Sequence, residues 1–308
     1  MKKIFTVFVS VFALLFTCLC SMAEPLSADH LTVTYVTSPL NVPTIVEKEN
    51  GVFEQVLGIP VSYAEIVSGA DQTQALASGD VQLLYAVGGT SVILSAANGA
   101  DIKVLNMYSR APGAFCLYSK DENLSSPESL KGKTIAGPAG TNLHELLVAY
   151  LDKAGMTIED VNFISMGIPE AKAGLDGGSV DAALLGGAAA YNAGVQGYHL
   201  VTDGTGLIQA IIAVAVTGKF AEDHPDVIEA ILAAEQTVME MIENDKESAF
   251  AAVAQILDLP VDAVRDMEKA YDFSLEITDD DIQGFQKTAD FMYESDMIEE
   301  PFDVNQLF

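Results

Sequence analysis

Residues 81–108 have the sequence VQLLYAVGGTSVILSAANGADIKVLNMY, and this stretch decides the fold. Residues 81–87 form an apolar run of strand length, and residues 90–97 have the pattern of a short helix. Residues 102–108 form a second strand-like run. Strand, helix and strand at this spacing predict a βαβ unit with a right-handed crossover.

The same alternation precedes this unit. Strands are predicted at residues 31–36 and 61–67, and helices at residues 42–57 and 71–77, with Gly51 a weak point in the first helix. Repeated βαβ spacing is typical of an α/β protein with mainly parallel sheets flanked by helices.

A second block with the same alternation begins after Ser125-Ser126-Pro127. We expect its strands at residues 134–136, 161–165 and 181–185, and its helices at residues 142–154, 169–175 and 188–193. Residues 198–202 end this block. The β-branched run at residues 208–216 is consistent with a strand that returns to the first sheet.

The last quarter of the chain is helical. A long helix follows Pro225, and Ile228, Ile231, Leu232, Val238, Met239 and Ile242 mark one face of it. Thr278-Asp279-Asp280-Asp281 has the pattern of a helix start, where carboxylates suit the helix dipole. The sequence thus predicts two lobes, one interrupted by the other: lobe I (24–112 plus 207–308) with a helical C-terminal tail, and lobe II (113–206).

The first 23 residues have the pattern of a cleaved signal peptide. Lys2 and Lys3 precede an uncharged run at residues 4–19, and small residues at Ser21 and Ala23 fit a cleavage site. We therefore expect a periplasmic or extracytoplasmic protein. Lipid anchoring at Cys18 or Cys20 is the weaker alternative, because neither Thr17 nor Leu19 is the small residue that should precede such a cysteine.

Composition excludes several classes of function. A net charge of −29 repels nucleic acid. Cys116 is the one cysteine beyond the expected cleavage point, and its apolar surroundings indicate a buried strand thiol. The four histidines are dispersed, so we expect neither a metal nor another cofactor.

Five loops at the carboxyl ends of predicted strands are candidate ligand contacts, because ligands of α/β sheets bind there, often against helix N-termini. From these loops and the helices that they open, the sequence predicts these ligand-binding residues: Ser38, Asn41, Gly89, Thr90, Ser109, Arg110, Thr141, Asn142, His144, Gly187 and Tyr191.

Arg110 is the most specific candidate, because the chain has only one other arginine, Arg265. Its planar fork can hold two oxygens of a carboxylate, sulfonate or phosphate. The alternative is a salt bridge to an acid near the hinge between the lobes. His144, in a predicted first helical turn, either donates to an anion or packs at the surface of its lobe.

Five further segments are informative together: IVEKENGVF (45–53), QALASGDV (74–81), SLKGKTIA (129–136), GSVDAA (178–183) and AEDHP (221–225). They resemble the nitrate/sulfonate/taurine-type substrate-binding proteins of ABC transporters, which are related to the thiamine-pyrimidine-precursor binding domain. The resemblance covers about residues 31–245. It implies a type II periplasmic-binding-protein clamshell, monomeric by our expectation, that closes around one solute and docks on an ABC permease and its ATPase.

The residues after the strand at 181–185 depart from the family, where a tryptophan or an acid is frequent. Gly186 to Ala190 are small, so an organic solute such as a sulfonate fits better than nitrate. A neutral pyrimidine or aromatic ligand, and a sensor that signals to a membrane kinase, are the alternatives. No nucleophile–base motif, P-loop or dinucleotide fingerprint occurs, so no enzyme is expected.

Overall fold

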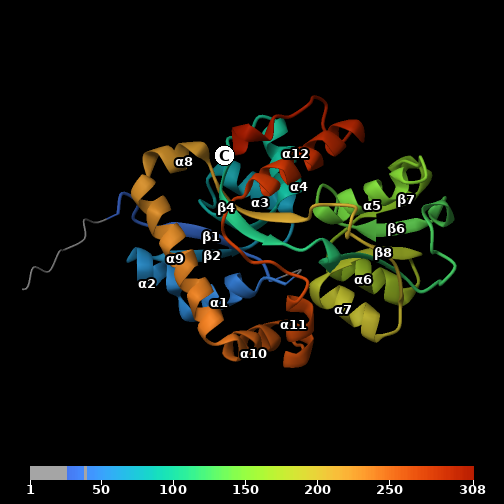
Figure 1. Cartoon of the computed structure of the whole chain (residues 1–308), viewed down its shortest axis with the longest axis horizontal. Helices are drawn as coiled ribbons and strands as arrows, with labels where there is room; N and C mark the ends of the chain where they lie inside the picture. Colours follow the sequence, from blue (N-terminus) through green and yellow to red (C-terminus); the bar gives the residue numbers. More distant parts are fainter. Residues whose placement is uncertain (1–25, 38–39) are drawn as a thin grey trace, which may run out of the picture.

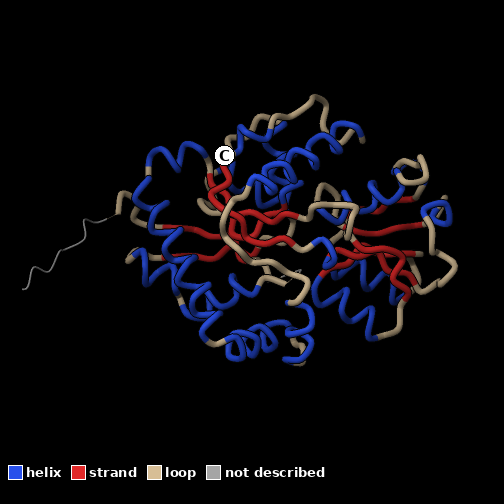
Figure 2. The backbone as a smooth tube through the Cα atoms, viewed as in Figure 1, coloured by secondary structure: helices blue, strands red, loops and turns tan. Residues whose placement is uncertain are grey.

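Strands and helices alternate through most of the computed structural model, which describes residues 26–37 and 40–308. Figure 1 shows two lobes side by side, with β6–β8 and α5–α7 (green to olive) forming one of them. In Figure 2 the strands of both lobes form a central layer with helices above and below. The expected signal peptide and Ser38 lie outside the described residues.

The first lobe contains two sheets. Its strands are β1 (Leu31–Tyr35), β2 (Val61–Glu65), β3 (Leu84–Gly88), β4 (Lys103–Arg110) and β10 (Ile211–Val216). β1 pairs with β2 in parallel, and β10 lies antiparallel between β3 and β4. This position confirms that the run predicted at 208–216 returns to the first lobe.

The second lobe is built on one five-stranded sheet in the order β7-β6-β8-β5-β9. These strands are β5 (Phe115–Ser119), β6 (Thr134–Gly137), β7 (Asn162–Ser165), β8 (Ala182–Gly186) and β9 (His199–Asp203). β6 runs parallel to β7 and β8, whereas β5 runs antiparallel to β8 and β9.

The α/β class is confirmed, but the sheets are mixed where mainly parallel sheets were expected. The exceptions are β5 and β10, the strands that begin just after the chain passes from one lobe to the other. A parallel neighbour needs a crossover connection, usually a helix. Neither crossing carries an α-helix, and each arriving strand lies antiparallel to both of its neighbours. The lobe boundaries near residues 112 and 206 remain predictions.

Helices cover these sheets. They are α1 (Val42–Asn50), α2 (Val52–Leu57), α3 (Gly69–Ser78), α4 (Gly89–Ala97), α5 (Asn142–Asp152), α6 (Ile168–Gly177), α7 (Gly187–Val195), α8 (Gly218–Asp223), α9 (Pro225–Asn244), α10 (Lys246–Leu257), α11 (Val261–Glu268) and α12 (Asp279–Glu294). Short 3₁₀ turns are η1 (Pro112–Ala114), η2 (Pro127–Leu130), η3 (Ile158–Asp160) and η4 (Val304–Leu307). Gly51 separates α1 from α2 because it adopts the left-handed conformation, with φ at 61°.

The C-terminal tail packs on the first lobe, where α12 begins with the expected acidic turn. The Thr278 hydroxyl accepts from Asp281 N, and the Asp281 carboxylate accepts from Thr278 N. α9 lies along α1 and α2 and buries Val227, Ile231, Ala234, Glu235, Val238 and Ile242. Leu232, predicted on this face, is exposed.

No helix in the described part of the chain combines the length and apolar character that a membrane span requires.

Candidate functional site

A pocket of about 590 Å³ opens between the two lobes. The first lobe contributes residues after β2 and β3, within 65–72 and 86–91. The second lobe contributes Phe115 and residues after β6 and β7, within 138–143 and 165–170. The carboxyl ends of parallel strands are where α/β proteins bind ligands. This pocket is therefore our candidate site.

The N-termini of α4 and α5 meet this pocket from opposite lobes. Gly88, the N-cap of α4, and Thr141, the N-cap of α5, both line it. No described side chain caps either terminus, so backbone N–H groups of the first turns stay available. Free N–H groups and the helix dipole favour a negatively charged group at such a position.

The loop before α5 is shaped by Gly140, which adopts a left-handed φ of 66°. Within this loop the Thr141 hydroxyl donates to Pro138 O at 2.8 Å. Ser91 of α4 donates to Gly140 O at 2.9 Å across the lobes. These contacts hold the α5 N-terminus beside the α4 N-terminus.

Acidic side chains also line the pocket. Glu65, Asp71 and Glu170 are exposed, and no described lining residue is a lysine, arginine or histidine. The Glu170 carboxylate fills the space that a Cβ at position 167 would occupy, so it covers the α6 N-terminus. The pocket thus offers N–H groups to an anion and carboxylates to a cation.

Two predicted residues, Thr141 and Asn142, line this pocket. The predicted loop after β3 also reaches it, but through Gly88 and Ser91 rather than Gly89 and Thr90. Gly89 packs against Phe285 and Ile211 O, and Thr90 hydrogen-bonds to Glu145 of α5. The helical turn directs these two residues into the seam between the lobes.

Arg110 does not line the pocket, and its guanidinium is fully engaged elsewhere. Nε and Nη2 donate to both carboxylate oxygens of Asp281 at 2.6 Å. Nη1 and Nη2 also donate to the carbonyl oxygens of Ser274 and Glu276 at 2.7 Å. Arg110 therefore forms a salt bridge, which was the alternative to anion binding. We no longer include Arg110 in the proposed site.

Three other predicted residues do not line this pocket, because each is buried or bonded to another part of the protein. Asn41 is buried and donates from Nδ2 to Val36 O at 2.7 Å. Ser109 is completely buried in β4. His144 Nδ1 accepts from Gly140 N, and the ring stacks on Phe163 at 4.9 Å between centroids. Burial lowers the pKa of His144, which opposes a role as a charged anion ligand.

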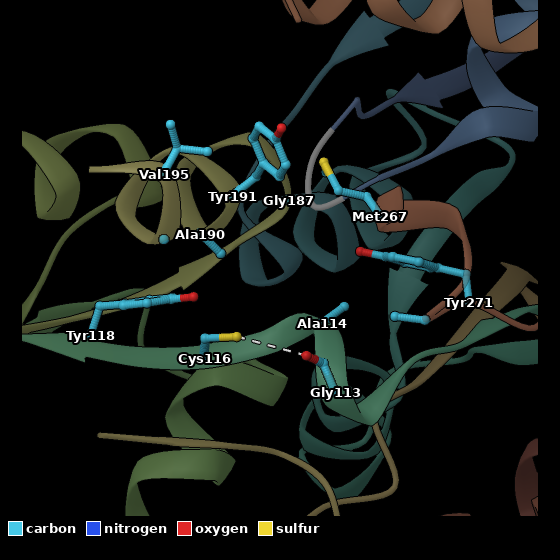
Figure 3. A pocket seen from close by; sticks show the side chains of 12 residues that line it. Gly113, Ala114, Cys116, Tyr118, Gly187, Ala190, Tyr191, Val195, Met267 and Tyr271 are labelled. Carbon is cyan, nitrogen blue, oxygen red and sulfur yellow. Dashed lines mark hydrogen bonds between the residues drawn. The ribbon is translucent and has the colours of Figure 1, made fainter. Parts of the chain in front are cut away.

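Gly187 and Tyr191 lie in a different pocket, of about 400 Å³ (Figure 3). Figure 3 shows α7 residues on one side, Met267 and Tyr271 on the other, and Cys116 and Tyr118 of β5 along the base. None of its described lining residues is charged. The larger pocket combines helix N-termini from both lobes, so we place the solute there.

Cys116 is confirmed as a buried strand thiol. Burial raises the pKa of this thiol to about 12, so it stays protonated at neutral pH and is a poor nucleophile.

Two contributing loops, residues 65–72 after β2 and 165–170 after β7, were not predicted. The predicted loops follow β1, β3, β4, β6 and β8, whereas these two follow β2 and β7. The signal was present: Ser68-Gly69 and Gly167-Ile168-Pro169 are recognisable helix starts.

Comparison with known proteins agrees with this geometry. The family model described as NMT1/THI5 like matches residues 38–249. The putative aliphatic sulfonates-binding protein of Bacillus subtilis (strain 168) is 28% identical over 100% of this chain and 94% of that protein. The taurine-binding periplasmic protein of Escherichia coli (strain K12) is 30% identical over 70% of this chain and 67% of that protein.

Among solved structures, the alkanesulfonate-binding protein from Xanthomonas axonopodis pv. citri, bound to MOPS, has a similar fold. The TM-score is 0.82 at 22% identity, and the alignment covers 90% of this chain and 97% of that one. This similarity confirms the two-lobed periplasmic-binding-protein architecture.

Proposed function

This chain belongs to the NMT1/THI5-like family, and we propose that it is the extracytoplasmic solute-binding protein of an ABC importer for a small organic sulfonate. The convergence of the α4 and α5 N-termini, one from each lobe, carries this proposal. An anion held by both termini makes contacts to both lobes only when they are together. Solute binding thereby favours hinge closure, and the closed form docks on the permease.

The carboxylates narrow the class of solute to an aminosulfonate of the taurine type. A simple alkanesulfonate gains nothing from Asp71 and Glu170 and is repelled by them, whereas Glu65 is already paired with Lys48 at 3.7 Å. An ammonium group at the other end of the solute reverses that sign. The family relatives named for taurine and for aliphatic sulfonates support both possibilities, and the acidic lining favours the zwitterion.

Export and transport complete the proposal. The expected signal peptide and the periplasmic relatives support a location outside the cytoplasm, next to a permease and its ATPase. We propose no catalytic activity, because the relatives named for aliphatic sulfonates and for taurine are binding proteins.

We first expect sulfonates to raise the melting temperature of the purified protein, since a ligand that binds the native state alone stabilises it. Isothermal titration with taurine and ethanesulfonate should show tighter binding of taurine. If neither compound binds while an uncharged aromatic compound does, the sulfonate assignment is wrong.

Replacing Thr141 by alanine should weaken taurine binding about fivefold to tenfold, the effect of losing one hydrogen bond that orders the loop before α5. The melting temperature should change little. Thr237→Ala is a matched control, since that hydroxyl also donates to a carbonyl, Ala233 O, but belongs to α9. A Thr141→Ala protein with unchanged affinity would remove this loop from the site.

Replacing Glu170 by glutamine separates the two solute classes. Taurine affinity should fall about twofold to fivefold, the range for an exposed ion pair. Ethanesulfonate affinity should stay equal or rise. Glu229→Gln, an acid on α9, is the control. Equal weakening of both compounds would show that the carboxylate does not recognise an ammonium group.

A further inference from the structure

A buried carboxyl group joins the two lobes beside the candidate site. Glu145 of α5 is only 3% exposed. Its Oε2 contacts the Thr90 hydroxyl of α4 at 2.6 Å, and its Oε1 accepts from the Thr288 hydroxyl of α12 at 3.1 Å. Both threonines belong to the first lobe and Glu145 to the second. Separation of the lobes would break both contacts.

The number of hydrogens available for the contacts in this cluster indicates the protonation state of Glu145. The Thr90 hydroxyl has one hydrogen, but it lies 2.7 Å from Asn142 Oδ1 and 2.6 Å from Glu145 Oε2. Asn142 Nδ2 donates to Ile211 O, which directs Oδ1 toward Thr90. With an ionised Glu145, one of the two short contacts would join two oxygens without a hydrogen between them.

Turning the Asn142 amide over would supply a donor to Thr90, but it would replace the 3.4 Å hydrogen bond to Ile211 O by an oxygen facing that carbonyl oxygen. A protonated Glu145 satisfies every contact. Its own O–H donates to Thr90, Thr90 donates to Asn142 Oδ1, and Thr288 donates to Glu145 Oε1. The geometry therefore fits the carboxylic acid better than the carboxylate.

No charged group compensates an ionised Glu145 from the elements packed around it. The pKa of Glu145 depends on burial and on the Thr90 and Thr288 hydroxyls, with no contribution from a charged side chain. A small void beside it is lined by Gly89, Thr90 and Ile93 of α4, Asn142 of α5, Ala210 and Ile211 near the start of β10, and Phe285 and Thr288 of α12. None of these titrates. His144, the next residue on α5, is occupied with Gly140 N and Phe163.

We propose that protonated Glu145 latches the two lobes together, so that solute capture by this protein strengthens as the pH falls. Glu145 contacts no solute in this proposal, because it lies in the seam and not in the pocket lining. It is a positioning residue that acts through the relative placement of the α4 and α5 N-termini. The solute-binding test below rests on the proposed function, and the scattering test does not.

The direction of the pH effect follows from burial. Burial raises the pKa of Glu145 to about 6, although the hydrogen bonds of Thr90 and Thr288 lower it. With the lobes apart the carboxyl meets water, and its pKa returns toward about 4.5. The latch is therefore fully present below about pH 4.5, weakens up to about pH 6, and is weakest above. The difference of about 1.5 pKa units limits the effect to roughly 30-fold in the equilibrium between latched and separated lobes.

Glu145→Gln is the decisive variant, because its amide reproduces the protonated acid: its NH₂ donates to Thr90 and its carbonyl accepts from Thr288. Taurine affinity should be measured by titration calorimetry from about pH 4.5 to about pH 7.5. The native protein should lose affinity over this range by up to roughly 30-fold. Glu145→Gln should show a flatter profile and bind more tightly than the native protein at the upper end.

Glu122→Gln is the matched control, since Glu122 is an exposed acid of the same lobe, and it should keep the native profile. A native profile without pH dependence, or the same dependence in Glu145→Gln, would overturn the latch.

Small-angle X-ray scattering without solute provides the independent readout. The radius of gyration of the native protein should rise between about pH 4.5 and about pH 7.5 as the lobes separate, and that of Glu145→Gln should not. If no sulfonate binds at any pH, the proposed function fails while scattering still decides the latch. Equal radii in both proteins at every pH would contradict the latch even if taurine binds.

Discussion

Replacing Arg110 by alanine should lower the free energy of unfolding by about 3 to 5 kcal/mol, the range for breaking a buried ion pair from one side. The Asp281 side chain is 6% exposed, so its carboxylate would stay buried without its cation. The carbonyl oxygens of Ser274 and Glu276 would lose their donors as well. Urea unfolding at neutral pH measures this loss.

Arg265→Ala is the matched control, because it removes the other arginine of the chain. Arg265 pairs with Glu247 and Asp262 on the surface, where its side chain is 39% exposed. Exposed pairs contribute about 0 to 1 kcal/mol, so this variant should unfold almost like the native protein. Similar losses of stability in both variants would contradict the prediction that the contacts of Arg110 with residues 274–281 stabilise the fold.

The Arg110–Asp281 pair also makes the free energy of unfolding depend on pH in the acidic range. Although burial raises the pKa of Asp281, hydrogen bonds from Arg110 and Thr278 outweigh it and hold that pKa below its ordinary value. A lowered pKa means that the stabilisation is present above the ordinary value of about 4 and is lost as the pH falls below it. In Arg110→Ala this acid dependence should shrink.

Arg110 illustrates what sequence alone can and cannot predict. The rarity of arginine and its place at a strand end were visible, and so was the acidic turn at 279–281. Their contact was not, because Asp281 lies 171 positions away along the chain. Local patterns predict caps and strands, whereas pairing between distant side chains depends on how the tail folds back.

The fold was more predictable than the site. The spacing of hydrophobic residues and the positions of glycines predicted the strands and helices, including the break at Gly51. Strand direction was not visible, because an apolar run such as β10 has the same pattern in a parallel or an antiparallel sheet. In the site, Thr141 and Asn142 followed from the rule for strand ends, but the side of the α4 turn that faces the pocket depends on packing against α12.

Glu235 is a buried acid that the hydrophobic pattern of α9 did not predict. It lies one helical turn after Ile231 and so falls on the buried face of α9, with 1% exposure. Asn106 Nδ2 donates to its Oε2 at 2.8 Å, while no described group forms a hydrogen bond with its Oε1. Burial raises the pKa of Glu235 to about 8, with the Asn106 hydrogen bond opposing the rise. A neutral carboxyl group is therefore buried in the first lobe at neutral pH.

Glu235→Gln should consequently raise the free energy of unfolding by about 2 to 4 kcal/mol at about pH 7.5. A raised pKa means that the stability of the native protein is complete below the unfolded value of about 4.5 and is lost as the pH rises toward about 8. Glutamine does not titrate, so the variant escapes this loss, and the two proteins should converge near pH 4.5.

Urea unfolding at both pH values tests the prediction, with Glu240→Gln, an exposed acid on α9, as the control that should show little change. A Glu235→Gln protein that is less stable than the native one at about pH 7.5 would show that the buried group is ionised there and held by contacts specific to a carboxylate.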